Sequence, residues 1–175
     1  MTWIQTYTGR KFHPLNPCED EIDIVDIAHA LALTCRYTGH CMTFFSVAQH
    51  SVMVSRMVPE CDALWGLMHD SAEAYVTDIA SPIKPYTRVG AIEDKLLLAI
   101  ANHFSLTMPI PSTVKTADLC CLERERRQLM GKPPEEWSTA GCWDGDETPI
   151  RPWKWTEAKF QFLERFRVLY REHVE

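Results

Sequence analysis

The sequence lacks any long run of apolar residues. Its longest apolar stretches, such as 96–101, are far shorter than the about 20 residues that a membrane-spanning helix needs. The first residues lack the basic start and the apolar run of a signal peptide. With 46% hydrophobic and 24% charged residues, the composition is typical of a globular protein. We therefore expect a cytoplasmic protein that makes no contact with a membrane.

The C-x-x-C spacing of metal-binding and redox motifs is also missing. The chain has seven cysteines, an odd number. A secreted disulfide framework usually has an even number of cysteines in a shorter chain, and a zinc knuckle needs paired cysteines. The pattern therefore favours reduced thiols over either, several of them on apolar helix faces.

A surplus of positive charge is absent as well, because the formal net charge is −6. The one basic run, Arg124-Glu-Arg126-Arg127, alternates with glutamate and is typical of a solvated helix face. Proteins that bind a nucleic acid backbone normally show a basic stripe. We therefore expect no polymeric DNA or RNA partner, whereas a small anionic substrate remains compatible with the charge.

What the sequence does contain is helical periodicity. Apolar residues recur at i, i+3, i+4 and i+7 in several segments, and capping residues or prolines bound them. The pattern predicts a first helix that begins at 24, continues beyond 35 and is stopped by Gly39. It predicts further helices over 46–57, 62–76, 92–103, 113–130 and 156–173. A small hairpin turning at Gly9 and a loop over 78–85 complete the prediction. The expected class is all-α, in one domain spanning 1–175.

The segment 131–155 is long and irregular, and it contains Trp137, Trp143 and Trp153. Such a segment often forms a lid or a contact surface. A monomer would have difficulty covering all three tryptophans, which favours a homo-oligomer with some of them at an interface. The alternative is a segment that folds back on its own domain.

Four polar residues stand out as metal ligands: His50, the pair His69-Asp70, and Asp118. His50 and Asp118 lie in otherwise apolar helical stretches, where a polar side chain needs a partner. Two imidazoles and two carboxylates suit one divalent transition metal, such as Mn, Co, Zn, Ni or Fe. The only histidine between Asp70 and Asp118 is His103, which lies on an apolar helix face, so one metal is favoured.

The residues that follow the His-Asp pair strengthen this prediction. A His-Asp dipeptide alone is weak evidence, because it arises easily by chance. Here Glu73 follows one helical turn after His69 and shares its face, and Asp78 and Lys84 lie on a proline-braced loop beyond the helix end. Such a set is difficult to explain as core or as random surface.

The order of these residues resembles the H…HD…D motif of HD-domain phosphohydrolases. The stretch 36–127 is similar to bacterial HD-domain 5′-deoxynucleotidases and their phage relatives, which include dATP triphosphohydrolases. The resemblance covers over half of the chain and rests on Arg36-Tyr37, the helix around His50, residues 69–84, and Lys115-Thr-Ala-Asp118. It implies a helical bundle with its core at about 23–130, followed by a loop and helix over 131–175.

The resemblance also implies the roles of individual residues. His50, His69, Asp70 and Asp118 would hold the metal. Glu73 would be catalytic and would orient or protonate water, and Arg36 and Lys84 would be catalytic residues that touch phosphate. The substrate-binding residues would be Arg36, Lys84, Tyr37, Asp78 and Pro82. Among them, Asp78 would accept a hydrogen bond from the sugar 3′-OH, and Pro82 can pack against a base. Relatives in this family tend to be homo-oligomers.

The resemblance leaves the substrate open. The deoxynucleotidases usually have tryptophan where this chain has Tyr37, and a smaller ring would loosen the exclusion of a ribose 2′-OH. The substrate is a nucleoside monophosphate that yields phosphate, or a triphosphate cut at the same ester bond to yield tripolyphosphate. A non-catalytic nucleotide-binding module is a further alternative, although such modules usually lose a ligand and this chain has the full set.

Overall fold

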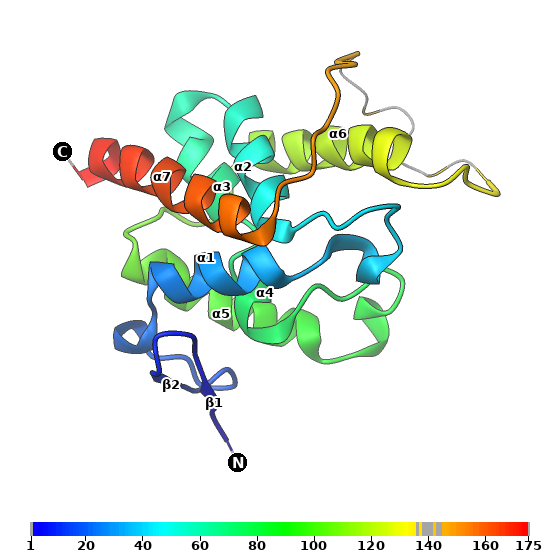
Figure 1. Cartoon of the computed structure of the whole chain (residues 1–175). Helices are drawn as coiled ribbons and strands as arrows, with labels where there is room; N and C mark the ends of the chain where they lie inside the picture. The colour runs from blue at the N-terminus through cyan, green and yellow to red at the C-terminus, as the bar shows by residue number, and fades with distance from the viewer. Residues whose placement is uncertain (1, 136, 138–141, 143–144, 175) are drawn as a thin grey trace.

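The computed structural model describes residues 2–135, 137, 142 and 145–174 and is mostly helical (Figure 1). The α-helices are α1 (Ile24–Leu33), α2 (Val47–Met57), α3 (Ala63–Met68), α4 (Glu73–Val76), α5 (Val89–His103), α6 (Ser112–Leu129) and α7 (Trp155–Val174). The all-α class is confirmed. In the described part of the chain, no helix is long and apolar enough to cross a membrane.

The predicted N-terminal hairpin is present. Strands β1 (Ile4–Gln5) and β2 (Lys11–Phe12) pair antiparallel, and Gly9 takes the positive φ of +83° that the turn requires. Phe12 is fully buried, and its ring stacks on that of Tyr75 with centroids 3.8 Å apart. The hairpin therefore packs against α4, the helix that begins with Glu73.

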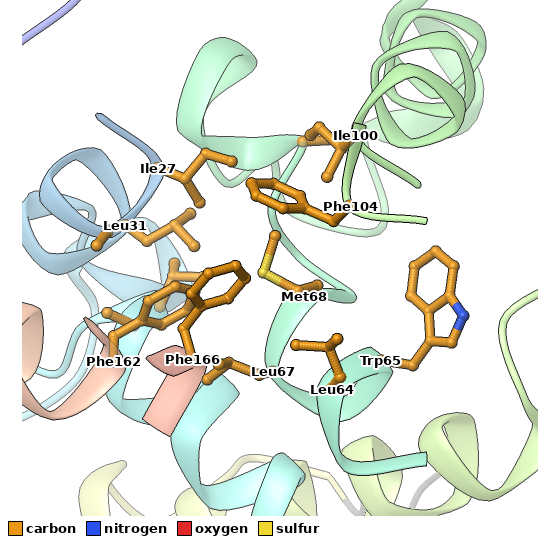
Figure 2. Packing of buried hydrophobic residues seen from close by; sticks show 14 of the residues in the cluster. Ile27, Leu31, Leu64, Trp65, Leu67, Met68, Ile100, Phe104, Phe162 and Phe166 are labelled. Atoms are coloured by element: carbon orange, nitrogen blue, oxygen red, sulfur yellow. The ribbon is translucent and has the colours of Figure 1, made fainter. Parts of the chain in front are cut away.

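The hydrophobic core lies where α1, α2, α3 and α7 meet. Figure 2 shows Ile27 and Leu31 of α1, Met68 of α3, and Phe162 and Phe166 of α7 directed toward one another. Helices α2, α5, α6 and α7 lie within three residues of their predicted bounds. Since α2 and α6 carry His50 and Asp118, this core fixes the backbone of two predicted ligands.

Helices α2 and α3 pack unusually closely at Gly66, which leads to a stability prediction. A Cβ at this position would lie 2.8 Å from the Cα atom of Ser55 and 3.1 Å from Cγ2 of Val58. Gly66→Ala is therefore expected to lower the free energy of unfolding by about 1–3 kcal/mol in urea titrations. Gly90→Ala is the control, because nothing lies within 4 Å of its added Cβ. Equal unfolding midpoints for the two variants would contradict this packing.

The first helix is shorter than predicted. It ends at Leu33, whereas the apolar spacing extended it past Cys35 toward Gly39. The chain leaves the helix because Arg36 N–H donates to the carbonyl of Phe45 at 2.9 Å and Cys35 pairs with Ser46. Residues Arg36–Gly39 form a separate tight turn instead.

The third predicted helix is broken in two. A turn over 69–72 separates α3 from α4, so the pair His69-Asp70 lies in a turn and not inside a helix as predicted. The backbone tightens there, since Ser71 N–H bonds the carbonyl of Met68 and Glu73 N–H bonds that of Asp70, each three residues back. The turn places the side chains of His69 and Asp70, two of the predicted ligands, at the end of α3.

The described part of the 131–155 segment folds back on the same chain. Trp153 packs against the core, and its backbone N–H donates to Oε1 of Gln49 at 2.8 Å. The ring of Trp137 lies 6.3 Å from that of Tyr37, between centroids. Trp143 lies outside the described residues. Two of the three tryptophans thus have partners within the chain, and the homo-oligomer stays a prediction.

Candidate metal centre

The structure brings together the four residues that the sequence suggested as metal ligands. His50 lies in the middle of α2 and is fully buried, and Asp118 faces it from α6 with 3.1 Å between Nε2 and Oδ1. Oδ2 of Asp70 lies 3.3 Å from Nε2 of His69 and 3.7 Å from Nε2 of His50. Ligand atoms of His50, His69 and Asp118 all lie within 4.8 Å of one another.

Each imidazole is oriented through its other nitrogen. Nδ1 of His50 lies 2.6 Å from Oε1 of Glu125, and Nδ1 of His69 lies 2.8 Å from the carbonyl oxygen of Gly66. Both Nε2 atoms are buried, and neither has a hydrogen-bond partner in the described part of the chain. Two oriented nitrogens without partners, facing two carboxylates, fit a divalent cation.

Electrostatics at this cluster also favour a cation. Burial raises the pKa of Asp118, but the neighbouring His50 outweighs it and holds this pKa below its usual value. Asp70 behaves in the same way, with His69 as the strongest of the groups that lower its pKa. Burial lowers the pKa of His50, whereas the carboxylates of Glu125 and Asp118 raise it to about 9. The carboxylates are therefore ionised and attract positive charge to this point.

Arg36 and Tyr37 reach the cluster from the turn after α1. The guanidinium is buried, with Nη1 3.6 Å from Oδ2 of Asp70 and Nε donating to Oε2 of Glu125 at 3.0 Å. The Tyr37 hydroxyl donates to the same Oε2 at 2.6 Å. The turn holds Tyr37 and Thr38 at φ of 58° and 53°, a left-handed conformation that is costly for these residue types.

Glu125 is a site residue that the sequence analysis missed. The run 124–127 was expected to be a solvated helix face, and this is wrong for Glu125, which is fully buried. A signal existed, because Glu125 follows Asp118 by seven residues and two helical turns return a side chain to the same face.

Glu73 begins α4 beside the four candidate metal ligands, and its carboxylate is buried. Burial is the main reason that its pKa rises to about 9, and the negative charges of Asp70 and Asp78 add to the effect. Nζ of Lys84 lies 3.7 Å from Oε1 of Glu73 and 3.1 Å from Oε1 of Glu93. Glu93, a further partner not anticipated from sequence, thus shares Lys84 with Glu73.

A pocket of about 730 Å³ opens next to the cluster. Tyr37, Asp78 and Pro82, the predicted nucleoside contacts, all line it, whereas Lys84 does not. The remaining lining residues are Arg36, Thr38, His40, Ala80, Ser81, Leu119, Leu122, Met130 and Trp137. The pocket thus combines a charged end at Arg36 with an apolar wall, a combination that suits a molecule with an anionic group and a flat ring.

Comparisons with known proteins identify relatives of this chain. A scan against protein-family models finds no match. The chain is 41% identical over 133 residues to the uncharacterised protein YfdR of Escherichia coli, covering 74% of this chain and 73% of that protein. An uncharacterised Rhodobacter capsulatus protein is 32% identical over 144 residues, with 74% of each chain covered. The 5′-deoxynucleotidase VP0926 of Vibrio parahaemolyticus is 30% identical over 99 residues, which span 57% of this chain and 44% of that protein.

Proposed function

Because the chain belongs to the protein family of YfdR from Escherichia coli and is also similar to a 5′-deoxynucleotidase, we propose that it is a metal-dependent nucleotide phosphohydrolase of the HD type. The similarity to the deoxynucleotidase supports a hydrolase. The finer proposal is hydrolysis of the 5′ phosphoester of a deoxynucleotide, which releases the nucleoside together with phosphate or tripolyphosphate.

One observation carries this proposal. The Nε2 atoms of His50 and His69 are buried without hydrogen-bond partners among the described residues, and they face the carboxylates of Asp70 and Asp118. Two imidazole nitrogens and two carboxylates that converge in this way match the ligand set of a divalent transition metal. These four residues would hold one divalent transition metal, which supplies positive charge for phosphoryl oxygens and lowers the pKa of a water for attack.

The residues around the cluster have chemistry that suits ester hydrolysis. Arg36 would bind a phosphate oxygen, because its Nη1 lies beside Asp70 at the edge of the cluster. Glu73 would donate the proton that the departing sugar oxygen needs, since burial of its carboxyl raises its pKa and favours the protonated form. Lys84, held between Glu73 and Glu93, would add positive charge at this end of the site.

The adjoining pocket would receive the nucleoside. Asp78 would accept a hydrogen bond from the sugar 3′-OH, Tyr37 would pack against the sugar, and Pro82 would pack against the base. The apolar wall formed by Leu119 and Leu122 suits the face of a base. The substrate is thus proposed as a small nucleotide and not a polymer.

A nucleotide panel with controlled metal content tests the function. The chain is treated with a chelator, restored with Mn²⁺ or Co²⁺, and assayed for phosphate and tripolyphosphate release. We expect chelation to lower turnover by about 10²-fold or more and either ion to restore it. Phosphate would identify a monophosphate substrate and tripolyphosphate a triphosphate substrate. Binding of nucleotides without any hydrolysis in restored protein would contradict the proposal and identify a non-catalytic module.

We also propose how the chain is arranged and where it acts. The residues from 1 to 175 are proposed to form one HD-type domain that acts in the cytoplasm as a homo-oligomer. Support for the single domain comes from the core, in which side chains of α1 and α7, from the two ends of the chain, pack together.

A further inference from the structure

Glu125 connects three residues of the site from the side opposite to the metal cluster. It is fully buried in α6. One of its oxygens is hydrogen-bonded to His50 of α2, and the other accepts hydrogen bonds from Arg36 and Tyr37 of the turn after α1. We infer that Glu125 is a positioning residue that sets the ligand nitrogen of His50 and the direction of the Arg36 guanidinium. This inference rests on the proposed function and adds a residue to its machinery.

The contact with His50 determines which ring nitrogen is free. An ionised carboxylate can only accept hydrogen bonds, so Nδ1 of His50, 2.6 Å from Oε1 of Glu125, must carry a proton and donate it. When the ring loses its second proton, the lone pair is therefore on Nε2, the atom that faces Asp118. Glu125 therefore selects the tautomer that can bind a cation.

The contacts with Arg36 and Tyr37 fix the turn that carries them. Arg36 has its Nε on Glu125 and its Nη1 toward Asp70, so the carboxylate of Glu125 directs the outer face of the guanidinium to the cluster. Tyr37 stands at a positive φ, a conformation that persists only where the surroundings enforce it. Its hydroxyl bond to Glu125 is such a restraint.

Stability alone does not account for this arrangement. A buried ion pair such as Arg36–Glu125 gains little for folding, because desolvation of both charges offsets their attraction. Apolar side chains of similar volume would fill the same space at no such cost. The carboxylate instead fixes the positions of side chains, since one rigid group binds donors from two segments, α2 and the turn after α1.

Glu125→Gln tests the inference by metal binding without reference to turnover. The amide can present its NH₂ group to Nδ1, which would place the ring proton on Nε2 and remove the lone pair needed for ligation. Calorimetric titration of chelator-treated protein with Mn²⁺ is expected to show affinity about 10- to 100-fold lower than in the unaltered chain. Unchanged affinity would overturn the inference.

Glu123→Gln is the matched control. Glu123 is also a fully buried glutamate of α6, and it binds Arg126 and Arg127 on the same helix. If its replacement lowers Mn²⁺ affinity as much as Glu125→Gln does, the loss reflects a general disturbance of α6 and the inference is wrong. Affinity within about twofold of the unaltered chain supports it.

A second measurement uses the unaltered chain, so it tests the inference even if the Glu125→Gln variant does not fold. Nitrogen-15 NMR of the unaltered chain with Zn²⁺ reports the proton on each histidine ring. A His50 ring with a protonated Nδ1 and Zn²⁺ on Nε2 is expected, and the reverse assignment overturns the inference. An unaltered chain that takes up neither Mn²⁺ nor Zn²⁺ contradicts the proposed function as well, whereas metal uptake with a protonated Nε2 contradicts the positioning role alone.

Discussion

Asp70→Asn is expected to reduce nucleotide hydrolysis by about 10³-fold or more and to reduce metal uptake with it. Oδ2 of Asp70 lies between the Nε2 atoms of both histidines and beside Nη1 of Arg36. Asparagine has nearly the same shape but no charge, and its NH₂ group cannot serve as a ligand. The change should therefore remove the ion without removing the fold.

The measurement compares metal content by mass spectrometry, turnover, and the urea midpoint of unfolding. Asp94→Asn is the control, because Asp94 is an exposed aspartate of α5 in a helix that carries none of the four proposed ligands. We expect that variant to keep full metal content and turnover. An Asp70→Asn chain that hydrolyses nucleotides at the normal rate would remove Asp70 from the metal site.

Helical periodicity predicted most of the fold because the buried faces of the long helices are regular. In α7, for example, Ala158, Phe162, Phe166 and Leu169 are all buried at helical spacing. The two errors occurred where local hydrogen bonds override that spacing. Pairing of Cys35 with Ser46 ended α1 early, and three-residue bonds tightened the turn after Met68. Periodicity carries no signal for either effect, since the first depends on a distant segment and the second on a local change from four-residue to three-residue hydrogen bonds.

The candidate site was predictable to the extent that its residues form a motif along the sequence. His69, Asp70 and Glu73 are close in sequence, and the fold adds His50 and Asp118 from two long, well-predicted helices. Glu93 and Glu125 were not anticipated because their function depends on what lies opposite them. A glutamate beside arginines is usually solvated, and only the packing of α6 against the turn at Arg36 shows that Glu125 is buried.

The break between α3 and α4 also has a consequence for chemistry. In a continuous helix, His69 and Glu73 would lie one above the other on the same face. The turn instead lets Nδ1 of His69 bond the carbonyl of Gly66, which directs Nε2 toward Asp70, and it places Glu73 at the start of a new helix. The side chains of His69 and Glu73 thus have different partners, the carbonyl of Gly66 for His69 and Lys84 for Glu73.

The second large effect concerns Glu73. Glu73→Ala is expected to lower turnover by about 10²-fold or more while leaving the metal content intact. The expected role of Glu73 is proton transfer, since its buried carboxylate has a pKa of about 9 and its Oε1 lies 3.7 Å from Nζ of Lys84. Glu73→Gln should lower turnover to a similar extent, because glutamine keeps the volume and the polar contact but has no proton to transfer.

Comparison of the two Glu73 variants with Glu93→Gln separates the possible causes. Glu93 is the other partner of Lys84, so its replacement alters the environment of that ammonium and keeps the carboxylic acid in place. Glu93→Gln is therefore expected to lower turnover less than either change at Glu73. If the alanine variant alone is slow, Glu73 acts by filling space. If metal is lost with either change, Glu73 is a ligand, because proton transfer to the sugar oxygen requires no contact between its carboxylate and the ion.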